Sequence, residues 1–363
     1  MTQAAVLAQL GNTPLGMRNR IINGAMEIDQ RNAGASVTVS GNSYYLDRYQ
    51  SYATVASKMS IQQNAGSVTP PDGYTNYLGV TSLSAYSLSA SDQFRLQQKI
   101  EGYNIADLGF GTANAKTFTL SFWVRSSLTG TFGGAFNNSG YLRSYPFTYT
   151  INSANTWEKK TITVAGDTSG TWNTTNGQGL IINFGLGIGS DNLGTAGSWT
   201  TNTYISATGA TSVVGTSGAT WYITGVQLEV GSVATEFERR PFGMELMLCQ
   251  RYYEKSYDID TAIGASTYTG AAVYGGGTTG STASFIGSTN TDFKVHKRAT
   301  PTIVWYDMVG NSNKIQRWQL GVHNTDNQTV TTVRNSQTGI GAYSGSGTSA
   351  SGLFAHWTAT AEL

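Results

Sequence analysis

The feature that most constrains the fold is a series of short runs in which apolar and polar residues alternate. Alternation with a period of two is typical of strands that bury one face. Clusters of Gly, Asn and Ser separate the runs, and helix-period patterns are missing between them, which disfavours a parallel sheet with crossover helices. The alternation predicts an antiparallel sandwich with these residues inside: Phe118, Leu120, Phe122, Ile182, Phe184, Val226 and Leu228.

The whole chain of 363 residues is predicted to be an all-β protein with two β domains. Residues 17–240 are expected to form a jelly-roll-like antiparallel β-sandwich, and residues 241–256 a hinge helix. Residues 257–363 are expected to form a second, smaller, Gly-rich β domain. Its predicted strands are the runs FKVHKR, PTIVWYD, KIQRWQL, QTVTTV and GLFAHWTATAEL.

The hinge is marked by a change from strand to helix periodicity. Pro241 ends any regular element before it. The next stretch contains neither Gly nor Pro, and we place a short helix at Glu245–Lys255. One face of that helix is expected to carry Glu245, Leu248, Cys249 and Tyr252.

Composition excludes several functional classes. Charged residues make up 12% of the chain and the formal net charge is +1, with no block of Lys or Arg, so no nucleic-acid partner is expected. No apolar run approaches the length of a membrane span, and the first residues lack the features of a secretory signal. The single cysteine, Cys249, excludes an internal disulfide framework. No cofactor is expected.

The first sixteen residues are interpreted as an arm. Val6, Leu7 and Leu10 form a small apolar patch that has no partner within its own segment. This patch indicates either a segment that becomes ordered when it binds another protein or a frayed chain terminus.

Residue types for catalysis or metal binding are present but not grouped. Cleavage of a glycosidic bond needs two carboxylates about 5–9.5 Å apart, and no local acidic pair fits. His296, His323 and His356 lack metal-ligand spacing, although threefold association could bring three copies of one histidine together. Asp167 and the pair Asp191–Asn192 suit either a calcium site or Asx turns. We predict no catalytic residue and no metal site.

Several long motifs resemble a family of bacteriophage virion proteins, described as tail-fibre or receptor-binding proteins. The motifs are NRIINGAMEIDQRNAGASVT, YYLDRYQ, TLSFWVRSS, WEKKTITVAGDTSGTW, WYITGVQLEVGSVATEFERRPFGMELMLCQRYYEKS and the closing ATAEL. The central region also resembles jelly-roll carbohydrate-binding modules. The resemblance implies a virion protein on an external appendage, most simply a trimeric tail-fibre subunit that binds host surface glycans. The alternative is a head-fibre or a capsid or tail decoration protein with no receptor-reading role.

That resemblance gives the arm and the aromatic residues an expected role. The arm would attach the protein to another virion protein, and residues 257–363 would form the distal tip. Trp123, Trp221 and Trp305 lie in strands and are expected to be core residues or to pack between sheets. The predicted glycan-binding residues are Tyr274, Tyr343, His323, Trp172 and Trp199. The four aromatic residues of this set are placed in loops, as is Tyr141, and packing on a neighbouring sheet or subunit is the alternative interpretation.

Overall fold

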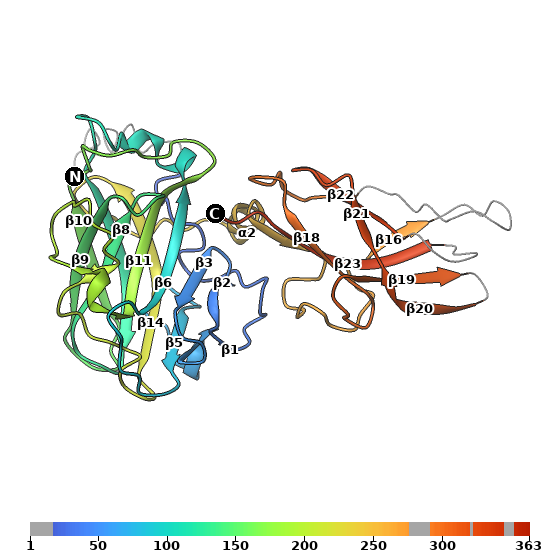
Figure 1. The fold of residues 1–363 in the computed structure, drawn as a ribbon, viewed down its shortest axis with the longest axis horizontal. Coiled ribbons are helices and arrows are strands. Elements are labelled where there is room, and N and C mark those ends of the chain that lie inside the picture. Colours follow the sequence, from blue (N-terminus) through green and yellow to red (C-terminus); the bar gives the residue numbers. More distant parts are fainter. Residues whose placement is uncertain (1–16, 276–290, 320–321, 345–351) are drawn as a thin grey trace. The chain divides into compact units, whose positions relative to one another are not determined.

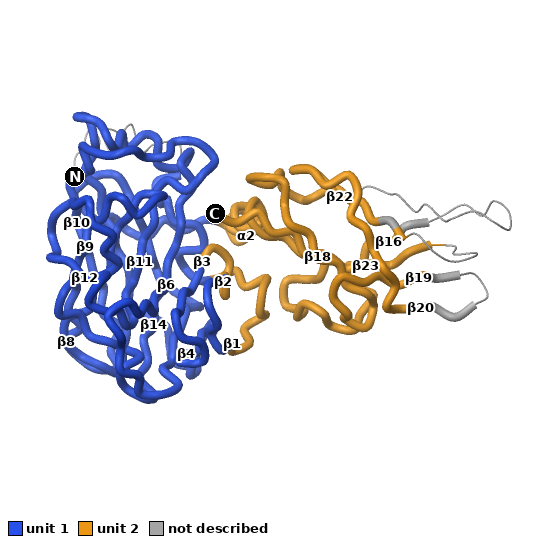
Figure 2. Tube along the Cα trace, in the orientation of Figure 1, with its two compact units in different colours: residues 1–26, 38–43, 50–240 blue, residues 27–37, 44–49, 241–363 orange. Residues whose placement is uncertain are grey.

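The computed structural model describes residues 17–275, 291–319, 322–344 and 352–363. At residues 274–275, 318–319, 322–325 and 343 it describes the backbone alone. The chain forms two compact units (Figure 2). The first contains residues 1–26, 38–43 and 50–240, and the second contains residues 27–37, 44–49 and 241–363. Two short segments from the N-terminal region therefore belong to the second unit.

The first unit is built on two six-stranded antiparallel sheets (Figure 1). One has the order β1 (Val37–Thr38), β4 (Met59–Gln63), β5 (Leu78–Ser82), β14 (Thr220–Val230), β7 (Phe118–Ser126) and β10 (Glu158–Val164). The other has the order β2 (Gly41–Leu46), β3 (Tyr49–Ala53), β6 (Gln93–Glu101), β11 (Gln178–Ile188), β8 (Gly130–Asn137) and β9 (Ser144–Ile151). Short pieces complete the unit: the parallel pair β12 (Leu193–Gly194) and β13 (Ser206–Ala207), and the 3-10 turns η1 (Ala65–Ser67), η2 (Gly102–Asn104), η3 (Ala106–Leu108) and η4 (Ser190–Asn192).

The two sheets pack face to face through aromatic side chains. Phe122 of β7 contacts Phe184 of β11 at a ring distance of 5.2 Å, and Phe184 lies 5.7 Å from the Trp221 ring of β14. The indole of Trp221 donates a hydrogen bond of 3.0 Å to the Tyr149 hydroxyl, so its one polar atom is satisfied inside the core. All seven residues predicted to lie inside are buried, which confirms the predicted sandwich and its register.

A bulge interrupts the pairing of β14 with β7 between Thr224 and Gln227. Gly225 has a φ of +61°, and a Cβ there would lie 2.6 Å from the Tyr74 hydroxyl. Only glycine meets both conditions, because other residues are strained at this φ and would clash.

The charged stretch that follows β14 holds the beginning of the described chain. Glu238 accepts a hydrogen bond of 2.7 Å from the Asn19 backbone, and the Asn19 side chain bonds the backbone of Val226 and Leu228. Arg240 donates to the Ile21 carbonyl at 3.0 Å. Two motifs more than two hundred residues apart thus form one hydrogen-bonded structure, and these charges stabilise the fold.

The second unit is organised around its last strand, β23 (Gly352–Thr360). Its neighbours are β15 (Tyr253–Lys255), β16 (Ala272–Gly275), β18 (Thr302–Tyr306) and β19 (Lys314–Gln319), and β20 (Val322–Thr329) pairs with β19. A separate sheet contains β17 (Thr291–Asp292), β22 (Gly339–Tyr343) and β21 (Thr331–Val333). Leu353, Ala355, Trp357 and Ala359 alternate along β23 and face the core of this unit.

The short helix after Pro241 is confirmed, but its predicted bounds are wrong, and its role as a hinge stays a prediction. Helix α2 spans Phe242–Gln250 with Pro241 at its N-cap. Tyr253–Lys255, expected to be helical, form β15 instead, because their backbones pair with Thr358–Thr360 of β23. Helix propensity gives way here to a sheet partner about a hundred residues away. No helix in the described part of the chain is long and apolar enough to cross a membrane.

Two predicted strands of the second unit also need correction. FKVHKR is not a strand, because β17 stops at Asp292 and Lys297 turns inward. The Lys297 ammonium donates to the Glu254 carboxylate at 2.5 Å and to the Gln250 carbonyl at 2.6 Å. The QTVTTV run is divided between β20 and β21 at Val330.

A buried ion-pair cluster joins the end of the chain to the N-terminal segments of the second unit. The Glu362 carboxylate pairs with Arg31 at 2.7 Å and also with Arg48, whose side chain is only 2% exposed. The Arg48 guanidinium lies 3.6 Å from the Tyr252 ring centroid, and that of Arg31 lies 3.9 Å from the Tyr253 ring. Residues 31, 48, 252–253 and 362 therefore contribute to one structural centre.

Candidate functional site

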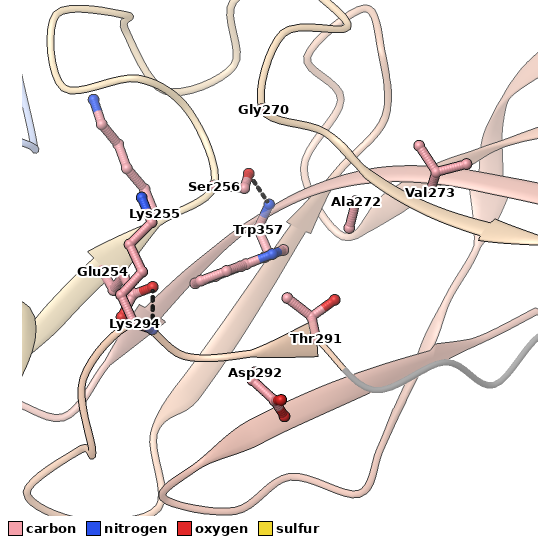
Figure 3. A pocket seen from close by; sticks show the side chains of 10 residues that line it. All are labelled: Glu254, Lys255, Ser256, Gly270, Ala272, Val273, Thr291, Asp292, Lys294 and Trp357. Atoms are coloured by element: carbon pink, nitrogen blue, oxygen red, sulfur yellow. Dashed lines mark hydrogen bonds between the residues drawn. The ribbon is translucent and has the colours of Figure 1, made fainter.

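An open pocket of about 410 Å³ lies in the second unit, between β15, β16, β17 and β23. Its volume falls in the range of about 300–1,000 Å³ that is usual for small-ligand sites. Figure 3 shows the Trp357 ring near its centre, with Glu254 and Lys294 on one side and Ala272 and Val273 on the other. The sheet pairing of β23 with β15 and β16 brings these residues together.

Trp357 forms the apolar floor of the pocket. Its ring packs edge to face against Phe293 at 5.5 Å, and the side chain is 3% exposed, so it belongs to the core of the unit. Its backbone N–H donates to the Ser256 hydroxyl at 3.0 Å. An aromatic floor beside hydroxyl groups suits a ligand with both apolar and polar faces.

The charged groups at the back of the pocket are already engaged. The Lys255 ammonium donates to the carbonyls of Ile259 and Thr261 at 2.9 and 2.6 Å. Glu254 accepts from the Lys297 ammonium and from the Lys294 backbone. Burial lowers the pKa of Lys255 and of Lys297. These groups therefore hold the pocket in shape.

The outer rim carries the groups that a ligand can reach. Asp292 and Lys294 are exposed, and Thr291 is half-buried. The rim offers one carboxylate, one ammonium and one hydroxyl, all on the short stretch that begins at β17. Such a set can hydrogen-bond a polyol from several directions.

A buried histidine supports the wall next to Ser256. The His356 Nε2 atom lies 3.0 Å from the Thr267 carbonyl oxygen and donates to it, so Nδ1 accepts from the Ser256 hydroxyl at 2.9 Å. The Tyr257 ring stacks on the imidazole at 3.7 Å. Burial lowers the pKa of His356, which favours the neutral ring. His356 is thus a structural residue in this unit.

The residues predicted to bind glycan at the tip lie on strands of the second unit. Tyr274 is in β16 and Tyr343 in β22, so their placement in loops is wrong. The backbone of Tyr274 pairs with Leu353, which no local sequence signal indicates. His323 lies in β20. The side chains of all three lie outside what the structure describes, as do Val6, Leu7 and Leu10 of the arm. Their predicted roles stay predictions.

Trp172 and Trp199 lie in loops of the first unit, as predicted, and contact each other at 5.5 Å. Trp172 is 8% exposed and packs against Phe110, while Trp199 is half-buried against Tyr145. Both indoles donate to backbone carbonyls, at 3.1 and 2.8 Å. The two rings form an aromatic cluster with their polar atoms satisfied, and their role in glycan binding stays a prediction.

Other residues weighed from the sequence have structural partners. Trp221 and Trp305 are buried as expected, whereas Trp123 is half-exposed. The Asp167 carboxylate accepts two hydrogen bonds from Arg143, at 2.6 and 2.7 Å, which raise the pKa of the guanidinium. Asp167 is therefore engaged in an ion pair.

The rim residues of the pocket were not found from the sequence. Lys294 lies in the run FKVHKR, which the sequence predicts to be a strand, and Asp292 directly precedes it; charged residues are expected on the solvent face of any such strand. Their position beside Trp357 depends on pairing with the last strand of the chain. Sequence separation of this size leaves no local signal.

No family model matches this sequence, and no curated protein matches it. Among solved structures, the chain is similar to the enzymatically active domain of tailspike protein 4 of bacteriophage CBA120, at 12% identity and a TM-score of 0.30. That match covers 59% of this chain and 22% of the tailspike chain, so this chain spans about a fifth of its length. A putative sugar-binding protein from Bacteroides thetaiotaomicron matches at 10% identity and a TM-score of 0.33, over 59% of this chain and 100% of the other. The TmCBM61 module, solved with β-1,4-galactotriose, matches at 11% identity and a TM-score of 0.29, over 59% and 99% of the two chains.

Proposed function

We propose that this chain is a subunit of a bacteriophage tail fibre and binds glycans of the host surface through the pocket of its second unit. The observation that supports this most directly is the pocket, where an indole floor adjoins half-buried Thr291 and exposed Asp292 and Lys294. Sugars present apolar C–H faces and neutral hydroxyls, so a site for them combines aromatic surface with hydrogen-bonding groups. The small net charge of the chain agrees with such a ligand.

The proposed activity is binding without cleavage. Hydrolysis of a glycosidic bond by the usual route needs two carboxylates that are free to act. Of the two carboxylates that line the pocket, Glu254 is engaged by Lys297, which leaves Asp292. Incubation with host polysaccharide should therefore release no new reducing ends.

The proposal includes a homotrimer attached to the particle through residues 1–16. Its support is the sequence resemblance, together with a composition of only 12% charged residues, which suits extensive uncharged interfaces. Three copies of a weak site would raise avidity when they can engage one surface together. Sedimentation of the purified chain as a stable monomer at micromolar concentration would contradict the trimer.

The binding proposal is tested with rim substitutions that leave the core intact. Asp292→Asn and Lys294→Met should weaken binding of the full chain to purified host polysaccharide and reduce its ability to block phage adsorption. Asp258→Asn, an exposed position of the same unit outside the pocket, is the matched control. Wild-type affinity per site is expected to be roughly millimolar to micromolar. If both rim variants bind and block like the wild type, the pocket is not the receptor site.

A further inference from the structure

A row of polar side chains lies on the face of β6 and β11 that points away from the sandwich core. Leu96 and Phe184 pair across these strands and face the core, so Gln97 and Asn183, the next pair, lie on the opposite face. Gln97 donates to the Gln50 side chain, and Asn183 donates to the Asn137 side chain at 2.8 Å. Amide side chains therefore run across β3, β6, β11 and β8.

Arg95 stands beside this row and is buried without a counter-charge. Its side chain is 7% exposed, with the guanidinium 4.9 Å from the Tyr52 ring and 5.2 Å from the Tyr141 ring. The Nη2 atom donates to the Tyr141 hydroxyl at 3.3 Å, while Nε and Nη1 have no hydrogen-bond partner. Within the described ranges no carboxylate lies at ion-pair distance from Arg95, unlike Arg143 with its Asp167. Burial lowers the pKa of Arg95.

Two further unsatisfied atoms belong to residues near Gly185, which lies next to Arg95 in the sheet. Gly185 pairs with Arg95, and a Cβ at Gly185 would lie 2.8 Å from the Ser206 hydroxyl oxygen. That hydroxyl and the Asn183 Oδ1 atom are buried and also lack a hydrogen-bond partner. Buried polar groups are normally paired, and a polar ligand on this face can supply partners for these atoms.

A carboxylate supplies what Arg95 lacks. A guanidinium taken out of water is costly unless an anion or several acceptors meet it, and two aromatic rings offset only part of that cost. Guanidinium groups bind carboxylates through two parallel N–H donors. Displacing the Tyr141 hydroxyl would present Nη1 and Nη2 as such a pair.

We propose that this cluster is a second saccharide site, specific for an acidic sugar whose carboxylate binds Arg95 and whose ring lies against Tyr52 and Tyr141. Both tyrosines are half-exposed, so part of each ring is within reach of a ligand. The inference rests on the proposed glycan-binding role, but it concerns the first unit and a different set of residues from the pocket.

The proposal is tested by titration calorimetry, in which the full chain is titrated with oligogalacturonate, with its methyl ester and with acetate. The ester replaces each carboxylate by an uncharged, slightly larger group on the same sugar rings, so a preference for the acid can be detected without a mutation. We expect the acid to bind about 10- to 100-fold more tightly than the ester, the usual range for a charge-assisted hydrogen bond. Binding should weaken as salt is added. Acetate at equal concentration should bind far more weakly than the oligosaccharide, since it lacks the ring.

Arg95→Gln should remove the preference for the acid. Arg125→Met is the matched control, because Arg125 also lies over a tyrosine ring, Tyr222 at 5.5 Å, in the same unit. Equal binding of acid and ester by the wild type overturns the acidic site, and so does a preference that survives Arg95→Gln. If the rim variants lose binding to host polysaccharide but keep the preference for the acidic oligosaccharide, the two sites are separate. Absence of any saccharide or host-polysaccharide binding by the wild type would contradict the proposed function itself.

Discussion

The ion-pair cluster at the end of the chain offers the sharpest test of what holds the second unit together. Glu362 is 6% exposed and neutralises both Arg31 and Arg48. Glu362→Gln keeps the size and one acceptor of the side chain but removes its charge, which leaves Arg48 buried without an anion. Removing one partner of a buried pair costs about 3–5 kcal/mol. We therefore expect the free energy of unfolding of the second unit to fall by about that amount.

Hydrogen exchange followed by mass spectrometry measures the two units separately, which matters because a two-unit chain need not unfold in one step. Peptides from β23 should lose protection in Glu362→Gln, while peptides from β7 should not change. Asp258→Asn, exposed in the same unit, serves as the control. If the free energy of opening of β23 in Glu362→Gln lies within about 0.5 kcal/mol of the wild-type value, the ion pair contributes no more than a solvent-exposed one. That result would refute the structural role of Glu362.

Three further outcomes are expected. Phe184→Ala should destabilise the first unit by about 3–5 kcal/mol because Phe184 is buried, whereas Val233→Ala at a 71% exposed position should be nearly neutral; equal melting of both would refute the core register. Burial raises the pKa of Asp47 to about 6, against the opposing effects of Arg31 and of hydrogen bonds from Gln30. The stability that this group contributes is present below about pH 4 and lost as pH rises through 6. The free energy of unfolding of the wild type, relative to that of Asp47→Asn, should therefore be up to about 3 kcal/mol lower at pH 7 than at pH 4, as measured by denaturation. The same difference between the two proteins at both pH values would contradict the raised pKa. Deleting residues 1–16 should leave a folded oligomer that is not incorporated into virions, and loss of folding would instead make the arm part of the fold.

Local patterns were sufficient to predict the strands β7, β11 and β14, which supply the predicted core residues of the sandwich. Phe118, Leu120 and Phe122 alternate with polar neighbours, and burial follows from that alternation because one face of the sheet meets the other. The same rule failed at Lys297, whose ammonium is buried by Glu254 from a distant strand. Tyr253–Lys255 likewise depend on β23, which follows about a hundred residues later.

The candidate site depended on such distant pairings throughout. Thr291, Asp292 and Lys294 form part of a pocket only because β23 places Trp357 beside them. Arg95 looks like an ordinary outward residue of an alternating strand, and only the structure shows it buried beneath Tyr141 from the connection between β8 and β9. Aromatic residues could be recognised as candidates from the sequence, but their burial and partners could not.

The central claim is that the pocket of the second unit binds host glycan, and hydrogen exchange of the full chain with and without purified host surface polysaccharide tests it most directly. The account predicts protection of the backbone in the segments 254–256, 270–273 and 291–294, which contain residues that line the pocket. The same peptides should show no protection in Asp292→Asn. Protection confined to the first unit, or no protection at any polysaccharide concentration that blocks adsorption, would contradict the claim.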